Sequence, residues 1–527
     1  MALTAAFSVR NRLSLTAGLA GLAAIVVALP LAGVIVAALG DATADIAARD
    51  VVRYAATSAW LALLVGVLTA ATGTLAAWLV VMHRFPGRDL FAWALALPLA
   101  VPAFALAYGY ADLFDVAGPL RMWLRDSLGH DLPFGMRSTG GAAFVLSCAF
   151  YPYVYLAMRA AFLNQSANTL EAARMLGAGR SRALWSVALP MARPALAAGV
   201  ALAVMETLAD YGAVQFLNVQ TLTTGVVRAW SVYGSTVSAA RFALPLLATA
   251  ALLLWIERRG RTGSVHDSAR GRWRAIVAQP LNGPAAWLAA GFCGLLVALG
   301  LVIPVGWLAW TLAGTLPDWP RLTQASVHSL LLGVAGAVAT VMLATMLALG
   351  TRGMPMAARL ASLGYATPGA VMAIGLLAPA GVIWSLTAGS GMATGVALLI
   401  YAYAARLMAA ALEPIDAGLT RVTPAMTQAA RTLGRSETGA ALAVELPVAR
   451  GAMLTAGLIV FVDILKELPA TLILRPFDFD TLAVIASNYA LDERLGQAGL
   501  PSILIVVLSL PAVVWLTRRI ARARPGA

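Results

Sequence analysis

Long apolar segments recur along this 527-residue chain and constrain its fold more than any other feature. A helix needs roughly 20 mostly apolar residues to cross a bilayer, and only helices and closed barrels satisfy their backbone hydrogen bonds inside lipid. The segments are continuous and rich in Ala, Leu and Val, which favours helices. Charged residues make up 12% of the chain, against about 25% in soluble domains. We therefore predict an all-α membrane protein with about 12 transmembrane helices.

The predicted spans form two groups of six. In the first half they lie near 13–39, 55–82, 90–111, 141–163, 190–217 and 240–256. In the second half they lie near 285–312, 326–350, 358–387, 393–412, 447–474 and 499–517. The first segment is too long for the apolar core of a signal peptide and shows no clear cleavage site, so we expect it to be a span.

The basic residues indicate how the spans are oriented. The formal net charge is +13, and the Arg residues gather in alternate loops. One set of helix ends carries Arg10, Arg12, Arg84, Arg88, the central run 257–274, Arg352, Arg359 and the tail 518–524. The positive-inside rule therefore predicts a multi-pass membrane protein with both termini in the cytoplasm. A nucleic-acid-binding face would not alternate with the spans, so we expect membrane lipid and no nucleic acid as a partner.

The chain contains one unit twice. Glu171-Ala-Ala-Arg aligns with Gln428-Ala-Ala-Arg at an offset of 257 residues. The same offset relates two further pairs: Gly177 with Gly434, and Leu189-Pro190 with Leu446-Pro447. Each copy holds an even number of spans, so the copies share one orientation and form a parallel repeat. The predicted domains are a first repeat over 1–260, a basic cytoplasmic linker over 261–284 and a second repeat over 285–527.

Each repeat carries a polar segment on the cytoplasmic side, over 165–190 and 422–447. Gly177 and Gly434 permit positive φ, which predicts a turn between two short helices in each segment. The proline of each Leu-Pro pair suits the first turn of the following span. One such segment would fit an amphipathic helix on the inner lipid surface. Two of them in register favour docking into a groove of a soluble partner.

The pattern E-A-A-x-x-x-G followed by Leu-Pro resembles the EAA loop of permease subunits in binding-protein-dependent ABC importers. In that family the loop is a coupling helix that docks into a cleft of the cytoplasmic ATPase. The resemblance implies a type I ABC importer transmembrane domain with an ABC ATPase dimer as its partner. It assigns ATPase coupling to Glu171, Ala172, Ala173 and Gly177, and to Gln428, Ala429, Ala430 and Gly434. Gln428 departs from the Glu that is usual in the family.

The energy source is expected outside this chain. A P-loop needs Gly-Lys-Ser/Thr, and the only lysine, Lys466, lies between Leu465 and Glu467. We therefore expect no enzyme activity and no cofactor bound by this chain, with Mg-ATP on the partner ATPase. Two alternatives come from other classes: an ion-coupled secondary carrier, which needs no ATPase, and a membrane scaffold that transports nothing.

Acidic residues late in the fifth span of each half mark a candidate substrate path. Their i, i+4 spacing puts both carboxylates of a pair on one helix face, and charged residues within spans are functional candidates by default. The first pair aligns with the second at the offset of 257, and the candidate path residues are Glu206, Asp210, Tyr211, Asp463, Lys466 and Glu467. Oxygen ligands suit a hard cation, which makes Asp210 and Glu467 the metal-ligand candidates. The alternative is that Lys466 only neutralises a neighbouring carboxylate and that some of the acids lie among outer headgroups.

Four longer stretches resemble the iron(III) ABC permease family in its fused two-repeat form. They are LADYGAVQFL (208–217), TLTTGVVRAW (221–230), KELPATLILRPFDFDTLA (466–483) and NYALDERLGQAGLP (488–501). The likeness extends over essentially the whole chain. It implies import of ferric iron from a periplasmic binding protein by alternating access, with both halves lining one path. Relatives with the same layout carry thiamine, and others carry oxyanions or polyamines, so these cargo classes stay open.

The remaining polar residues carry weaker signals. Cys148 and Cys293 have no neighbour at metal-ligand or redox spacing, so we expect them to be small core residues. No two of the four histidines share metal-ligand spacing. Arg228, Arg475 and Asp480 fall in outer loops, where they either contact the binding protein or are solvated.

Overall fold

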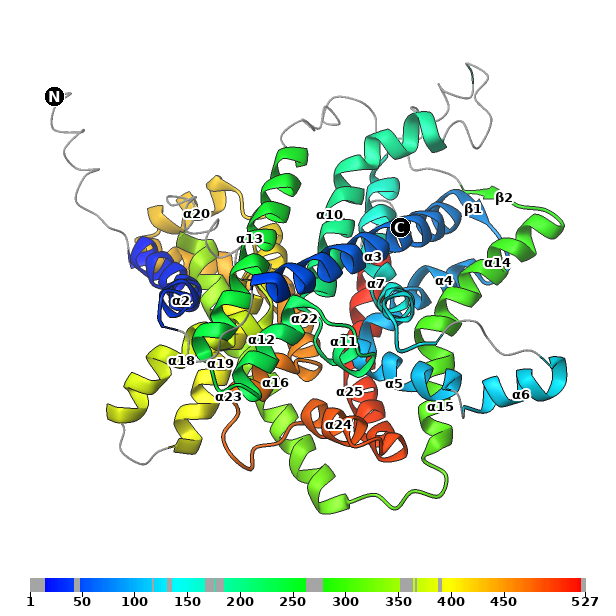
Figure 1. The fold of residues 1–527 in the computed structure, drawn as a ribbon. Helices are drawn as coiled ribbons and strands as arrows, with labels where there is room; N and C mark the ends of the chain where they lie inside the picture. The colour runs from blue at the N-terminus through cyan, green and yellow to red at the C-terminus, as the bar shows by residue number, and fades with distance from the viewer. Residues whose placement is uncertain are drawn as a thin grey trace.

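The computed structural model describes residues 15–41, 48–115, 118–129, 135–165, 175, 184–261, 278–350, 364, 367–386 and 391–522. Within these ranges the chain is a bundle of helices (Figure 1). The only sheet in the described part is a parallel pair of two-residue strands, β1 (His83–Arg84) and β2 (Gln279–Pro280). The predicted all-α class is confirmed.

The helices of both halves follow the order of the chain. Those of the first half are α2 (Leu15–Ala38), α3 (Ala48–Met82), α4 (Arg88–Ala94), η1 (Leu97–Ala100), α5 (Ala103–Phe114), α6 (Pro119–Leu128), α7 (Thr139–Asn164), η2 (Leu184–Ala188), α10 (Leu189–Ala209), α11 (Gly212–Phe216), α12 (Leu222–Ser231) and α13 (Thr236–Arg261). Those of the second half are α14 (Pro284–Val297), η4 (Ala298–Val302), α15 (Ile303–Thr311), α16 (Trp319–Gly350), α18 (Gly369–Leu386), α19 (Gly391–Leu419), α20 (Pro424–Thr432), α21 (Glu437–Ala440), η6 (Ala441–Glu445), α22 (Leu446–Leu465), α23 (Pro469–Leu474), α24 (Leu482–Leu491) and α25 (Leu495–Arg522).

The described residues contain 10 helices long and apolar enough to cross a membrane, or up to 11 if one bent pair counts as a span. The bent pair replaces the predicted continuous span over 90–111, which is wrong. The chain turns by 91° between Arg88–Ala100 and Ala103–Ser127, where Pro102 takes an extended conformation ahead of α5. Proline has no N–H to continue a helix, so the apolar run cannot stay straight there. The predicted span over 358–387 falls partly outside the described residues, and its described part is α18.

Both fifth spans also break, at equivalent places. The spans predicted near 190–217 and 447–474 are present but end earlier, because α10 ends at Ala209 and α22 at Leu465, and the short helices α11 and α23 follow. In the first half the Asp210 carboxylate accepts hydrogen bonds at 3.1 Å from the backbone N–H groups of Ala213 and Val214. In the second half the Glu467 carboxylate accepts one at 3.1 Å from Ala470. Such side-chain bonds satisfy backbone donors that a continuous helix would otherwise pair.

The repeat seen in the sequence is also a repeat of structure. A five-residue π-helical turn, η2 or η6, precedes α10 and α22 at the offset of 257. The Leu-Pro proline lies in the first turn of both long helices, as predicted. Ser58 accepts a hydrogen bond from the Leu222 N–H at 2.8 Å, and Ser329 accepts one from Leu482 at 2.9 Å. The same contacts are therefore built twice.

The two halves exchange their first helices. Helix α2 of the first half packs against α16 and α18 of the second, and α14, η4 and α15 of the second half pack against α3, α5 and α7 of the first. The backbones of α2 and α18 approach so closely that a Cβ on Gly33 would lie 2.0 Å from the Gly375 carbonyl oxygen. Across the other exchange, the Tyr110 hydroxyl donates to the Leu299 carbonyl at 2.5 Å. Neither half therefore completes its core alone.

Candidate functional site

All six path residues predicted from the sequence line one cavity. It has a volume of about 70 Å³ and lies where α10 and α11 of the first half face α22 and α23 of the second. We call it the carboxylate cavity, and the predicted residues in its lining are Glu206, Asp210, Tyr211, Asp463, Lys466 and Glu467. This volume holds a few water molecules or a small ion. The structure thus brings together two acidic pairs that are far apart in the chain.

The second half supplies a cation to each of its carboxylates. Arg406 of α19 lines the cavity, and its guanidinium pairs with the Glu467 carboxylate. The Lys466 ammonium lies 3.0 Å from the Asp463 carboxylate. Sequence analysis missed Arg406, although the signal was present as an Arg inside the predicted span 393–412.

Glu467 is fixed from several sides at once. Besides the Arg406 guanidinium and the Ala470 N–H, it meets Gly369 at the start of α18, where an added Cβ would lie 2.2 Å from its carboxylate oxygen. The ion pair and the hydrogen bond replace the hydration that the Glu467 carboxylate loses on burial. Glu467 therefore acts as a fixed part of the wall.

The first half contributes acids to the cavity but no Arg or Lys among its described lining residues. Glu206 lies close enough to Arg406, Asp463, Lys466 and Glu467 for their charges to act on it across the interface. Counted over the described lining, four carboxylates face two cations. The cavity is therefore formally anionic, and the excess comes from the first half.

Two further cavities adjoin the carboxylate cavity. A large one of about 680 Å³, here called the apolar cavity, shares Leu99, Tyr153, Asp463 and Lys466 with it. A smaller one of about 190 Å³, here called the polar cavity, shares Tyr211 with it. The carboxylate cavity therefore lies between the other two, sharing Tyr211 with the polar cavity and four lining residues with the apolar cavity.

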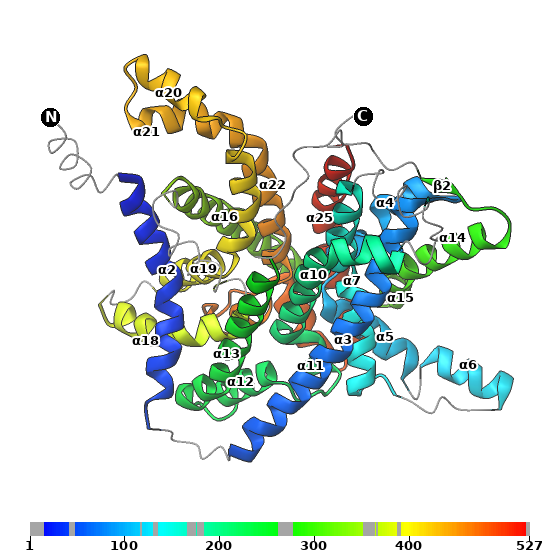
Figure 2. The same ribbon diagram turned by 90° about the horizontal axis from the view of Figure 1, so that it is seen from above.

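The row of cavities runs along the bundle. The apolar cavity reaches Glu413 and Pro414, near the end of α19 that leads into α20, and Thr517 near the end of α25. Figure 2 shows α20, α21 and the last turns of α25 at one end of the molecule, with α11 and α12, which line the polar cavity, toward the other. The path therefore widens toward the end that carries α20.

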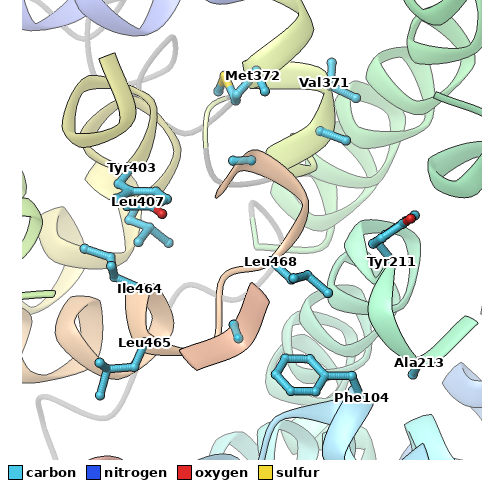
Figure 3. Packing of buried hydrophobic residues seen from close by; sticks show 14 of the residues in the cluster. Phe104, Tyr211, Ala213, Val371, Met372, Tyr403, Leu407, Ile464, Leu465 and Leu468 are labelled. Atoms are coloured by element: carbon cyan, nitrogen blue, oxygen red, sulfur yellow. The ribbon is translucent and has the colours of Figure 1, made fainter. Parts of the chain in front are cut away.

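On the opposite side the carboxylate cavity is closed by apolar side chains from both halves. A Cβ on Gly212 would lie 2.8 Å from the Phe104 Cβ and 3.0 Å from a methyl group of Leu468. Figure 3 shows Leu468 of the second half directed toward Phe104 and Tyr211 of the first. We call these three residues and Gly212 the apolar closure. The largest of the three cavities thus reaches toward α20, and the apolar closure lies on the other side of the carboxylate cavity.

The second polar segment forms two short helices joined by a turn, as predicted. Gly434 has φ of +84° between α20 and α21, a conformation that favours glycine. Gln428, Ala429 and Ala430 lie in α20, where the first two are exposed and Ala430 is buried. The corresponding residues of the first segment, Glu171, Ala172, Ala173 and Gly177, lie outside the described residues.

Large apolar side chains stand exposed around these polar segments. Leu433 at the end of α20 is 85% exposed, and Trp185 and Leu442, which the repeat makes equivalent, are 69% and 65% exposed. Exposed apolar side chains also occur along many of the apolar spanning helices, so these three differ from the rest only in lying beside the polar segments. Both halves therefore present apolar side chains at the end where the prediction places the ATPase.

The other sequence predictions meet different outcomes. Cys148 and Cys293 are buried free thiols, which confirms them as core residues. No three His, Cys, Asp or Glu side chains in the described ranges converge as a metal site, so Asp210 and Glu467 remain ligand candidates only. The Asp480 carboxylate pairs with Arg475 of its own loop and, at 3.1 Å, with Arg321 of α16, so it fastens this loop to α16.

Comparison with known proteins gives the chain its relatives. Residues 62–259 match the family described as "Binding-protein-dependent transport system inner membrane component". The chain is 26% identical over 461 residues to the Fe(3+)-transport system permease protein FbpB 2 of Haemophilus influenzae, covering 85% of this chain and 86% of that one.

Shorter similarities reach permeases named for oxyanions. The sulfate transport system permease protein CysT of Escherichia coli is 34% identical over 148 residues, which is 28% of this chain and 51% of that one. The molybdenum transport system permease protein ModB of Escherichia coli is 33% identical over 141 residues, which is 27% of this chain and 60% of that one.

Proposed function

We propose that this chain is the permease subunit of an ATP-driven ABC importer and that its cargo is ferric iron. Residues 62–259 match the family of binding-protein-dependent transport system inner membrane components, and the described residues contain 10, or up to 11, helices long and apolar enough to cross a membrane. The long alignment with an iron(III) permease supports this cargo, because it spans both halves of the chain. The expected partners are a cytoplasmic ATPase dimer that carries Mg-ATP and a periplasmic binding protein that delivers the iron.

The composition of the carboxylate cavity supports a cationic cargo. Its described lining has more carboxylates than cations, and the cations Arg406 and Lys466 are each paired with a carboxylate of their own half. An oxyanion such as sulfate or molybdate needs hydrogen-bond donors and positive charge aimed at it. A hard cation instead prefers carboxylate oxygens. The cavity therefore favours a cation over the oxyanions of the shorter relatives.

The conformation supports alternating access. The apolar cavity reaches toward α20, while the apolar closure of Phe104, Tyr211, Gly212 and Leu468 lies on the other side of the carboxylate cavity. In the proposed cycle, ATP draws the ATPase dimer together, the two polar segments follow, and the halves rock until the closure parts. Iron then enters from the docked binding protein, and hydrolysis returns the halves to the conformation described.

The test is uptake of radiolabelled iron into vesicles that contain the chain, its co-expressed ATPase and the iron-loaded binding protein. Uptake should require ATP and persist after proton and sodium gradients are dissipated. Labelled sulfate, molybdate and thiamine, each with its own loaded binding protein, are the comparison cargoes. Transport of one of these in place of iron would overturn the cargo assignment, and uptake driven by an ion gradient without ATP would overturn the ABC mechanism.

A further inference from the structure

A groove lies between α5 of the first half and α15 and α25 of the second, and we call it the lateral groove. It has a volume of about 650 Å³, and its wall includes Asp112, Trp307, Trp310 and Glu493. The three helices pack against one another, so both halves of the chain build it. Among the described residues it shares no lining with the carboxylate, apolar or polar cavity, so it is a site separate from the proposed path.

The lateral groove lies at one end of the spanning helices. Its wall contains Thr311, the last residue of the span Pro284–Thr311, and Leu495, the first residue of the span Leu495–Arg518. The last turns of α25 lie at the end of the molecule that carries α20, so Leu495 marks the opposite end (Figure 2). The groove is therefore at the level where the spans meet water on the side away from α20.

The lateral groove also faces the surroundings of the bundle. The span that ends in its wall exposes Leu295, Val302 and Trp310, whose exposed fractions are 54%, 59% and 72%. Apolar side chains that no helix covers along a span contact lipid, and Trp is enriched where lipid meets water. Because Trp310 belongs to the groove wall, the groove opens toward the lipid around the bundle.

The described wall of the lateral groove carries negative charge without a cation of its own. It contains the carboxylates of Asp112 and Glu493 and no Arg or Lys. Asp112 is half-buried, and the Trp307 Nε1–H donates to its Oδ2 at 2.7 Å, which fixes the carboxylate but leaves its charge. No described Arg, Lys or His pairs with Asp112. Glu493 pairs with Arg137 of the outer loop at 3.7 Å, and both side chains are exposed, so this pair is weak.

We propose that the lateral groove binds the headgroup of phosphatidylethanolamine from the surrounding membrane. The ammonium of this lipid donates to the free Oδ1 of Asp112 and lies against the indole rings of the wall, which attract a cation through their faces. The volume is within the range of pockets that bind small molecules, ~300–1,000 Å³. The inference goes beyond the proposed function, because neither the cargo nor ATP enters it.

The same wall discriminates against the other common headgroups. Phosphatidylglycerol has a net negative charge, which the two carboxylates repel. Phosphatidylcholine carries a cation that the indole rings attract, but its quaternary nitrogen has no N–H to donate to Asp112. The expected order of affinity is therefore ethanolamine, then choline, then glycerol.

The first experiment measures this order without any variant. The purified full chain is incubated in detergent with equal amounts of the three lipids, all with the same acyl chains, and native mass spectrometry counts the lipid that each molecule retains. Phosphatidylethanolamine should be retained at least threefold more than either of the others. Equal retention of the three lipids would overturn the proposal.

The second experiment removes the charge and keeps the shape. Asp112→Asn still offers an oxygen to the Trp307 Nε1–H, and it should lower retention of phosphatidylethanolamine about threefold to fivefold, the size of one partly exposed ion pair. Asp318→Asn is the matched control, because Asp318 lies in the wall of a neighbouring pocket and not in that of the lateral groove. Unchanged retention in Asp112→Asn, or an equal loss in both variants, would contradict the assignment of the site to Asp112.

The third experiment separates the lipid from the periplasmic binding protein, whose lysines could also reach this end of the molecule. An excess of iron-loaded binding protein is added to the chain with its retained lipid. The amount of phosphatidylethanolamine should not change. Release of the lipid, together with weaker affinity of the binding protein for Asp112→Asn, would assign the lateral groove to that protein and overturn the lipid proposal.

Discussion

Helices α10 and α22 carry the same acidic spacing but meet different surroundings. Asp463, within α22, is neutralised by Lys466, and Glu467, just after α22, is neutralised by Arg406; both cations belong to the same half. Glu206 and Asp210 of the first half face the same cavity, whose described lining from that half holds no Arg or Lys. The duplicated unit has therefore diverged in charge while its backbone stayed alike.

This difference assigns separate roles to the two acidic pairs. The second-half pair is structural, because its charges are matched where they stand. The first-half pair supplies the excess negative charge that favours a cation. The predictions below compare the two halves and the contact between them, from the largest expected effect to the smallest.

The largest effect is expected from Arg406→Met, which leaves the buried Glu467 carboxylate without its cation. Breaking a buried ion pair from one side costs about 3–5 kcal/mol. Thermal unfolding of the purified chain in detergent should show this loss. The double variant Arg406→Met/Glu467→Gln should recover most of it, and a single variant as stable as the unsubstituted chain would contradict the structural role of the pair.

Gly212→Ala should come next, because its new Cβ would meet Phe104 and Leu468 below 3.1 Å. Overpacking a tight contact costs about 1–3 kcal/mol, and here the cost falls only on the conformation in which the closure is shut. Gly457→Ala in α22, where the nearest atom is 3.7 Å away, is the matched control. Crosslinking between cysteines placed across the closure measures the shift; equal crosslinking in both variants would argue against a closure at this point.

Glu206→Gln and Asp463→Asn remove one negative charge each from the two halves. We expect Glu206→Gln to lower the rate of iron uptake about tenfold, because it removes part of the charge excess that attracts the cargo. Asp463→Asn should have a smaller effect on this rate, because the Asp463 carboxylate is already paired with Lys466 in the unsubstituted chain. Uptake assays with matched amounts of protein in the membrane compare the two. Equal losses would mean that the halves do not differ in role.

The smallest effect is expected from Gln428→Glu, which makes the second polar segment match Glu171 of the first. Gln428 is exposed on α20, and a single surface charge contributes about 0–1 kcal/mol. Binding of the ATPase should therefore change by no more than several-fold, as measured by affinity in detergent. Loss of ATPase binding would instead show that the two segments need different residues at this position.

The sequence predicted the acidic pairs well because a fixed offset of 257 carries them through both copies. It did not predict the helix breaks at Asp210 and Glu467, because the apolar run continues past both residues and hydropathy does not register a side chain that caps the next helix. Arg406 was missed because no motif marks it and its partner lies 61 residues away in the chain. The proline at position 102 was a sequence signal for the bend, but the predicted span over 90–111 rested only on the length of the apolar run.

The exchange of first helices could not be predicted from the sequence either. Hydrophobic periodicity shows that a helix has a buried face, but it does not show which half of the molecule covers that face. Tyr401 of α19 donates to the Val26 carbonyl at 2.6 Å, a contact between residues at opposite ends of the chain. Such long-range pairing is set by the packed interface and leaves no local pattern. Domain boundaries drawn at the linker therefore describe the duplication and not two bodies that fold separately.

The exchange of first helices imposes a delay between the synthesis of α2 and its packing against the second half. Helix α2 ends at Ala38, whereas α16, one of the helices it packs against, begins at Trp319. Ribosomes add about 5–20 residues per second, so the roughly 280 intervening residues take ~15–60 s to appear. During this time α2 waits in the membrane without its final neighbours. A ribosome that stalls in the linker would therefore leave α2 packed only against α13 of its own half, without α16 and α18, and the uncovered face of α2 would mark the unfinished chain for quality-control proteases.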